Sequence, residues 1–366
     1  MKTFTKLLLL LNILLVSTSY AAQNSPIEGF AQYAGTTGGA GGKVYTVTNC
    51  KSDTSSGGLK WAIAKTGPRI IHFTPGINCT IVWKTLTYIN SDNITIDGAG
   101  ANIIISGMSL DLFNTLNPNY DPGLPAHNII VRNLKFYNTN VDRSAISIAA
   151  GSSKIWIDHC TFSNNAQPGD HVGQGITIWN YGDDYPFTGI TLSWNHFIKP
   201  NAKSILIGRQ YYDTPAIINV SVHHNFFDGV DARNVRIHGP GSLVHEWNNY
   251  VYAWTEYGAG ASSGADIWAQ NNYFEDNNNL AGNSHDAVNC SYGSPPVTAT
   301  YFASDSCRTS GNFLGFSGTA TQIPLISIGV QPTQPFNTNW IPYSYNLEVA
   351  STALKNELKT GTGANK

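Results

Sequence analysis

The stretch Asn219-Val-Ser-Val-His-His-Asn-Phe-Phe227 holds the pattern on which the fold prediction rests. It opens with two valines that alternate with polar residues, which is typical of a β-strand, and closes with an asparagine and aromatic residues. Related segments start between 23 residues (219 to 242) and 35 residues (93 to 128) apart. The seven segments are Asn93–Asp97, Asn128–Arg132, Lys154–Asp158, Gly189–Ser193, Asn219–His223, Ser242–Glu246 and Ala265–Ala269. Repeats of this length indicate units that stack on one another.

Asparagine and aromatic residues recur at fixed offsets after these strands. When the strands are aligned, one position holds Asn195, Asn225, Asn248 and Asn271, and another holds Phe136, Phe162, Phe197, Phe227, Tyr250 and Tyr273. In a parallel coil, equivalent residues lie about 4.8 Å apart, so amides can hydrogen-bond along the stack and aromatic rings can pack offset. A β-sandwich is the alternative, but it does not need one residue type at one offset. We therefore expect an all-β chain in a right-handed parallel β-helix.

The composition excludes several classes of protein. Only 12% of the 366 residues are charged, against about a quarter in typical soluble domains, and the formal net charge is −2. That balance excludes a generally basic nucleic-acid binder, and the scarcity of helix-forming residues argues against a helical bundle. The mean hydropathy of −0.16, with one long apolar run at the N-terminus, excludes a membrane-embedded body.

The N-terminus has the pattern of a secretory signal peptide. Lys2 and Lys6 precede the apolar run of residues 7–16, and the small residues Ser19 and Ala21 follow it. We expect residues 1–21 to be removed on export, so that the formal net charge falls from −2 to −4 with the loss of two lysines. An uncleaved anchor is the alternative. Residues 22–366 are then expected to form a single domain.

Both ends of the coil need cover, because a solenoid exposes apolar surface there. Residues 56–64 predict a short amphipathic helix that caps one end, and residues 351–358 predict a final helix. Residues 277–339 are rich in Gly, Pro, Ser and Thr and show little periodicity. We expect residues 277–366 to form long loops and a C-terminal helix packed on the coil.

The chain has five cysteines, and export permits disulfides. Because the number is odd, at least one thiol stays unpaired. Cys290 and Cys307 share one polar region and form the first candidate pair, and Cys50 with Cys79 forms the second. Cys160 lies in an apolar strand, where we expect a buried thiol. No CxxC spacing suggests a zinc site.

A set of motifs, in order along most of the mature chain, resembles polysaccharide lyase family 1, the pectate and pectin lyases. The motifs are Gly29-Phe-Ala31, Gly35-Thr-Thr-Gly-Gly-Ala-Gly-Gly-Lys-Val44, Asp97-Gly-Ala-Gly100, Ile155-Trp-Ile-Asp-His-Cys160, Ser193-Trp-Asn195, Lys203-Ser-Ile-Leu-Ile-Gly208, Val222-His-His-Asn225, Asn248-Asn-Tyr250 and Pro342-Tyr-Ser-Tyr345. The resemblance implies a parallel β-helix and a monomeric, secreted enzyme. It also implies an acidic plant cell-wall polysaccharide, pectate or pectin, as partner, with no nucleic acid and no membrane.

The implied reaction is β-elimination in polygalacturonate. A base removes the proton at C5 and the C4 oxygen leaves, which requires neutralisation of the adjacent carboxylate. Lys203 stands where the family has a carboxylate-binding lysine. The segment after His223-His224-Asn225 lacks the usual proline, and Arg233 and Arg236 lie closer together than usual. We expect Arg233 as base with Arg236 as supporting cation, or Arg236 alone, and Arg209 among the substrate-binding residues.

Calcium is the cofactor that the resemblance implies, and the sequence supports it only in part. Asp158 matches one family ligand, but Gln174 and Ile178 stand at the usual acidic pair. Asp170 and Asp184 lie close enough in sequence to substitute as oxygen ligands. Two alternatives for calcium therefore remain: a site formed by the protein itself, or a calcium ion bridged only through the substrate.

Three other functions compete with a pectate lyase. A pectin lyase would act on methyl-esterified polymer without calcium. A polygalacturonase would need two or three inward carboxylates, and the sequence shows no matching cluster. A non-catalytic β-helix could bind cell walls as an adhesin. Trp179, Trp247 and Trp254 fit either a sugar groove or a stacked core, and the histidines of the motifs fit hydrogen-bonded structural positions.

Overall fold

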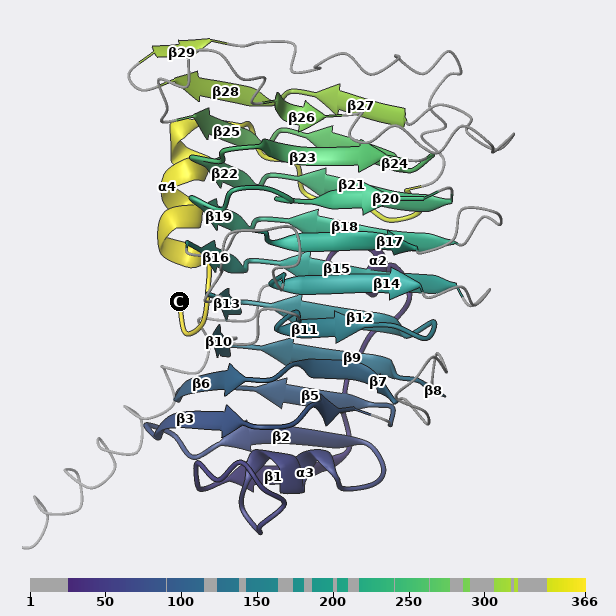
Figure 1. The fold of residues 1–366 in the computed structure, drawn as a ribbon, viewed down its shortest axis with the longest axis vertical. Helices are drawn as coiled ribbons and strands as arrows, with labels where there is room; N and C mark the ends of the chain where they lie inside the picture. The colour runs from purple at the N-terminus through teal and green to yellow at the C-terminus, as the bar shows by residue number, and fades with distance from the viewer. Residues whose placement is uncertain are drawn as a thin grey trace, which may run out of the picture.

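The computed structural model describes most of the chain beyond the N-terminal segment. The described residues are 26–89, 91–114, 124–137, 143–163, 174–180, 186–199, 203–209, 217–239, 241–262, 264–276, 286–289, 306–316, 319–321 and 341–366. They coil into stacked turns in which three parallel sheets run the length of the molecule (Figure 1). This confirms the predicted parallel β-helix. In this part of the chain no helix is long and apolar enough to cross a membrane.

Sheet A contains the seven segments that the sequence repeat identified. Its strands, in spatial order, are β1 (Lys43–Val47), β2 (Arg69–Phe73), β5 (Ile94–Asp97), β9 (His127–Arg132), β12 (Ser153–Asp158), β15 (Phe187–Ser193), β18 (Ile218–His223), β21 (Ser242–Trp247), β24 (Asp266–Gln270) and β27 (Ser306–Ser310). Neighbours pair in parallel throughout. One strand of each turn therefore lies directly above the same strand of the turn before it.

Sheets B and C complete each turn. Sheet B contains β3 (Asn78–Trp83), β6 (Asn102–Gly107), β10 (Lys135–Tyr137), β13 (Thr161–Phe162), β16 (His196–Ile198), β19 (Phe226–Asp228), β22 (Tyr250–Tyr252), β25 (Tyr273–Asp276), β28 (Phe313–Phe316) and β29 (Thr319–Thr321). Sheet C contains β4 (Thr87–Tyr88), β7 (Leu110–Asn114), β11 (Ile146–Ile148), β14 (Ile176–Asn180), β17 (Ile205–Arg209), β20 (Arg236–His238), β23 (Tyr257–Ser262) and β26 (Asp286–Asn289), with β8 (Leu124–Pro125) paired to β7. The chain passes from sheet A to B to C in each turn.

The interior of the coil is a continuous apolar core. Every second residue of each strand points inward, and Ile, Leu, Val and Phe dominate those positions. Phe136, Phe162, Phe197 and Phe227 stack with ring centroids 4.9 to 5.2 Å apart. The predicted aromatic stack is confirmed for these four residues.

An asparagine ladder runs up the corner between sheets A and B. Its members are Asn195, Asn225, Asn249, Asn272 and Asn312. From Asn225 onward, each side-chain oxygen accepts the backbone N–H and the side-chain amide of the asparagine one turn earlier, as at Asn225, which accepts from Asn195 at 2.9 and 3.1 Å. The side-chain oxygen of Asn195 accepts the backbone N–H of Cys160. These bonds satisfy buried backbone groups at a bend where the sheet ladder stops.

The sequence alignment is wrong by one residue from β21 onward. The register pairs Asn219 with Leu243, not with Ser242, so the ladder passes through Asn249 and Asn272 rather than Asn248 and Asn271. The same shift moves Tyr250 and Tyr273 out of the interior stack. They join Phe226 on the outer face of sheet B, where Leu354 and Leu358 of the final helix cover them.

The ends and flanks of the coil are covered by short helices and the C-terminal segment. Helix α3 (Leu59–Ile63) buries Leu59, Ala62 and Ile63 at the first turn, as predicted. Helix α4 (Thr352–Gly361) is the predicted final helix and lies against sheet B (Figure 1). Helix α2 (Gly29–Tyr33) lies on sheet A. Gly29 has φ of +76° and a side chain there would meet the Ser221 hydroxyl at 2.1 Å, so the position requires glycine.

Part of the expected loop region belongs to the coil. The prediction that residues 277–339 form only loops is wrong, because β26, β27, β28 and β29 lie within that range. Strand β27 pairs in parallel with β24 although its sequence, Ser-Cys-Arg-Thr-Ser, has no apolar alternation. Backbone pairing with the edge strand β24 places this segment in the sheet, although its sequence lacks the apolar alternation of a strand.

The cysteines follow the second of the two expected pairings. Cys50 and Cys79 form a disulfide near the capped end, and Cys160 is a buried free thiol as predicted. Cys290 lies outside the described residues, so its expected bond to Cys307 stays a prediction.

A carboxyl group occupies the interior of the coil. Glu246 pairs with Val222 on the inward side of sheet A and is 2% exposed. Burial raises its pKa to about 8, because the charged form is disfavoured away from water. The group is therefore protonated in the folded protein at neutral pH.

The buried carboxyl group of Glu246 should make the protein less stable as the pH rises. The folded protein binds the carboxyl proton more tightly than the unfolded chain does, so the stabilisation that this proton gives is complete below the ordinary pKa of 4.5 and is lost as the pH rises through about 8. Between these two pKa values we expect the free energy of unfolding to fall by about 1.4 kcal/mol per pH unit. Glu246→Gln is expected to remove that slope in urea unfolding at pH 5 and pH 8. The exposed control Glu256→Gln should keep it, and an unchanged slope in Glu246→Gln would contradict the assignment.

Candidate active site

The outer face of sheet C collects the basic residues that the sequence singled out. Strand register places Leu206 of β17 between Thr177 of β14 and Arg236 of β20 in one outward column. Lys203 precedes β17 and forms an isolated parallel bridge with Ala232. Consecutive turns therefore bring Lys203 and the Arg233–Arg236 segment to neighbouring positions.

A local irregularity directs Arg233 away from the strand. Between the Lys203–Ala232 bridge and the Leu206–Arg236 pair, the later turn has one residue more than the earlier turn. Arg233 takes up this excess with φ of +57°, the left-handed region that side chains rarely adopt. Asn234 behind it is buried and its side-chain oxygen accepts from the Ser204 hydroxyl at 2.9 Å. The backbone at Arg233 is thus fixed by the turn before it.

Arg233 reaches back across the turn that carries Lys203. Its Nη1 donates to Oε1 of Gln174 at 2.9 Å, although 59 residues separate the two. Gln174 and Lys203 are both buried, with Lys203 only 4% exposed. Arg233 and Gln174 therefore meet at the edge of sheet C, on the two turns that flank the turn of Lys203.

The electrostatic setting lowers the pKa of Arg233. Burial is the main cause, and the neighbouring charge of Arg236 acts in the same direction against the opposite effect of Tyr257 and Glu256. Burial, followed by the positive charges of Arg236 and Arg233, lowers the pKa of His238 to about 4. The site is therefore rich in positive charge, and His238 within it is neutral at pH 7.

Two aromatic rings lie farther along the same face. Trp179 of β14 and His238 of β20 stack with centroids 6.1 Å apart, and Gly208 of β17 lies between them in the register. Trp247 and Trp254, the other candidates for a sugar groove, are buried. Of these three tryptophans, only Trp179 reaches the surface of the site.

Asp158 is not part of this site. It lies on β12 of sheet A, where its carboxylate accepts from the Ser193 hydroxyl at 2.7 Å and contacts His159 Nδ1 at 2.6 Å. Asp158, which the resemblance implied as a calcium ligand, therefore lies on a different sheet from the strands that carry Arg209 and Arg236. Sequence spacing fixed its strand but not the sheet to which the cations belong.

The remaining predicted site residues are described only in part. Arg209 ends β17 and pairs with Asn180, but its side chain lies outside the description. Asp170 and Asp184 fall among residues that the structure does not describe. The histidines are structural: His224 Nε2 lies 2.9 Å from Glu348, and His223 Nδ1 lies 2.9 Å from His224 Nδ1. Burial holds the pKa of His223 well below its usual range.

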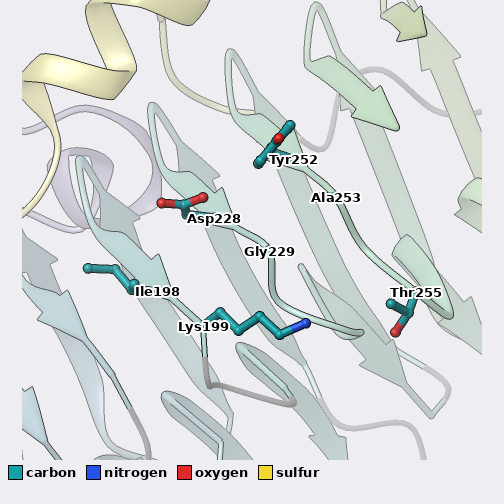
Figure 2. Close-up of a pocket in the computed structure, with 7 residues that line it drawn as sticks. All are labelled: Ile198, Lys199, Asp228, Gly229, Tyr252, Ala253 and Thr255. Carbon is teal, nitrogen blue, oxygen red and sulfur yellow. The ribbon is translucent and has the colours of Figure 1, made fainter. Parts of the chain in front are cut away.

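A cavity of about 340 Å³ lies where sheet B turns into sheet C (Figure 2). Its lining is Ile198, Lys199, Asp228, Gly229, Tyr252, Ala253 and Thr255. The Lys199 side chain is 64% exposed, and its Nζ lies 3.8 Å from the Asp231 carboxylate. With Asp228 also present, carboxylates outnumber the lysine, so this cavity suits a polyanion less well than the outer face of sheet C.

A search of family models finds the one described as "Pectate lyase", and the match covers residues 2–366. The chain belongs to the pectate lyase family. Among curated pectate lyases, the chain is 28% identical over 348 residues to a pectate trisaccharide-lyase of Bacillus licheniformis, covering 93% of this chain and 86% of the relative. It is 31% identical over 273 residues to pectate lyase 1 of Ambrosia artemisiifolia, covering 68% and 61%.

Solved pectate lyases share the fold. A pectate lyase from Bacillus sp. N165, solved in complex with trigalacturonate, has a TM-score of 0.67 at 23% identity, covering 93% of this chain and 99% of its own. A thermostable pectate lyase has a TM-score of 0.68 at 22% identity, covering 93% and 97%. At these identities the likeness shows the parallel β-helix and no more.

The described residues of this pectate lyase do not fit a calcium ion held by the protein at the Gln174 position. The amide oxygen of Gln174 accepts from Arg233, Ile178 points into the core, and Asp158 lies on another sheet. Within the described ranges no three His, Cys, Asp or Glu side chains are grouped to hold a metal. A guanidinium in this position repels a divalent cation.

Sequence reasoning missed two features of this pectate lyase site. The contact between Arg233 and Gln174 depends on the extra residue of the later turn, which no spacing rule shows. The pairing of Trp179 with His238 depends on Gly208 between them. The signal for the second feature was present, because all three positions follow in-register apolar pairs in β14, β17 and β20.

Proposed function

We propose that this pectate lyase family member cleaves polygalacturonate by β-elimination on the outer face of sheet C. The observation that carries the proposal is the cluster of Lys203, Arg233 and Arg236 from successive turns, with the pKa of Arg233 lowered. A uronate carboxylate needs cations of this kind before its neighbouring C–H can be ionised.

Each cation has a proposed role in the reaction. Lys203 and Arg236 neutralise the carboxylate, so that negative charge developing at C5 is stabilised. Arg233 in its neutral form takes the C5 proton. The electron pair of that C–H bond becomes the C4–C5 double bond, and the C4–O bond breaks with its electron pair on the departing oxygen. That oxygen takes a proton from solvent water, and Arg233 returns its own proton to solvent. The products are an unsaturated sugar end and a shortened chain.

An arginine base requires unusual surroundings, since its guanidinium stays protonated in nearly all proteins. Burial and the charge of Arg236 both favour loss of the proton from Arg233. The hydrogen bond to the neutral amide of Gln174 orients the Arg233 side chain. Arg236 alone as base remains the second candidate, because it lies in the outward column of the same face.

The competing functions have less support. A pectin lyase and a non-catalytic wall-binding β-helix share this fold, but the curated relatives described above are pectate lyases. We propose a monomer formed by residues 22–366, exported after removal of residues 1–21, with Arg209 among the substrate-binding residues. Asp170 and Asp184 stay proposed only as oxygen ligands for calcium that arrives bridged by substrate carboxylates.

Replacement of Lys203 tests the carboxylate-binding role. Lys203→Met keeps the aliphatic stem of this buried side chain and removes the charge. We expect kcat/KM on polygalacturonate, followed by the ultraviolet absorbance of the unsaturated product, to fall by about 10²-fold to 10³-fold. The control Lys199→Met removes an exposed lysine at the cavity of Figure 2 and should leave the rate unchanged. Equal rates for the two variants would refute the role of Lys203.

A pH series distinguishes the two candidate bases. The neutral fraction of a guanidinium grows with pH, so we expect kcat of the wild type to rise on the alkaline side. Arg233→Lys should shift this rise to lower pH, because the ordinary lysine pKa is about 10.4. Arg233→Gln should lose about 10²-fold to 10⁴-fold in kcat. If Arg236→Lys shifts the profile and Arg233→Lys does not, Arg236 is the base.

Chelation tests the role of calcium. Because Arg233 already contacts Gln174, we expect calcium to act only where substrate carboxylates bridge it, so EDTA should lower the initial rate on polygalacturonate and added calcium should restore it. Calcium added without substrate should leave the thermal unfolding midpoint unchanged, since a ligand that binds the folded state raises it. A midpoint raised by calcium alone, or a rate that EDTA leaves unchanged, would contradict this account.

A further inference from the structure

The stacked pair of Trp179 and His238 lies on the two turns that flank the turn of Lys203, and His238 shares strand β20 with Arg236. Both side chains are half-buried and point outward from sheet C. The ring planes differ by 9°, and the centroids are 6.1 Å apart. Such a pair brings two nearly parallel aromatic rings together at the face on which we place the substrate.

Glycine between them is what allows the two rings to approach. Gly208 has φ of +155°, and a side chain there would lie 2.4 Å from the His238 carbonyl oxygen and 3.0 Å from its Cβ. Any residue other than glycine at position 208 would place a side chain between the two rings. The backbone of β17 therefore leaves room for Trp179 and His238 to lean across one turn.

The pair is close to the cations along the strand. His238 follows Arg236 by two residues on the same face of β20, a separation of about 7 Å. Lys203 precedes β17, the strand that carries Gly208. Cations and aromatic rings thus divide one outer face, with positive charge toward the start of the strands and uncharged rings toward their ends.

The charge state of His238 suits an uncharged stacking surface. Burial, followed by Arg236 and Arg233, lowers its pKa to about 4, so the imidazole is neutral at pH 7. Its Nδ1 lies 2.9 Å from the hydroxyl of Ser262, which fixes the orientation of the ring. A neutral ring repels neither the C–H face of a sugar nor the neighbouring guanidinium.

We propose that Trp179 and His238 form a stacking subsite for the pyranose ring next to the uronate held by Lys203 and Arg236. The identity of the ligand rests on the proposed function. The C–H groups on one face of a pyranose carry partial positive charge and pack on the electron-rich face of an aromatic ring. The subsite contributes binding and does not contact the atoms that react.

The test separates binding from chemistry. Trp179→Ala is expected to raise KM for polygalacturonate about tenfold, equivalent to about 1.4 kcal/mol, with kcat within about twofold of the wild type. Trp179→Phe keeps a ring and should recover most of the loss, which a folding defect would not do. Trp61→Ala removes a partly buried tryptophan of α3, at the capped end of the coil, and is the matched control.

The outcomes distinguish this subsite from the proposed function. If the wild type makes no unsaturated product, the proposed function fails, and binding is then followed by tryptophan fluorescence during titration with polygalacturonate. Loss of that binding in Trp179→Ala but not in Trp61→Ala would support the subsite. Equal KM values, or equal affinities, for Trp179→Ala and Trp61→Ala would overturn it.

Discussion

The vertical register between successive turns is the constraint on which this molecule depends. Parallel pairing holds equivalent residues of neighbouring turns about 4.8 Å apart, so each side chain meets its counterparts above and below. The asparagine ladder fixes this register at one corner, where Asn225 bonds to both Asn195 and Asn249. Once the register is set, the phenylalanine stack, the isoleucine core and the outward columns of sheet C follow from it.

The proposed active site uses the register to concentrate charge that would otherwise disperse. Arg233 and Arg236 lie on one segment that backbone bonds hold within the stack, so the repulsion between their guanidinium groups cannot be relieved by simple separation. The cost of gathering them falls on the folded state, and the substrate carboxylate can relieve it. An anion that neutralises this cluster would gain affinity from electrostatic strain already present in the free protein.

The sequence was sufficient for seven of the ten strands of sheet A, β5 to β24, and for most of the core, because repetition and apolar alternation can be read directly from the sequence. It was insufficient where turns differ in length. The shift at β21 moved the ladder from Asn248 to Asn249 and turned Glu246 inward. The extra residue at Arg233 created its contact with Gln174. The position of Asp158 could not be predicted for a related reason. Its motif identifies the strand but does not show which of the three sheets carries the site.

The C-terminal segment changes how a stack of this kind can unfold. In a simple solenoid each turn contacts only its neighbours, so the ends can fray while the middle stays folded. Here Gly363 donates to Trp194, Ala364 to Thr161, and Asn365 to Ala101, a residue 264 positions earlier. The C-terminal segment therefore contacts both late and early turns of the coil. Release of the last dozen residues would uncouple the turns, and a protein that melts as one unit would become one that opens in stages.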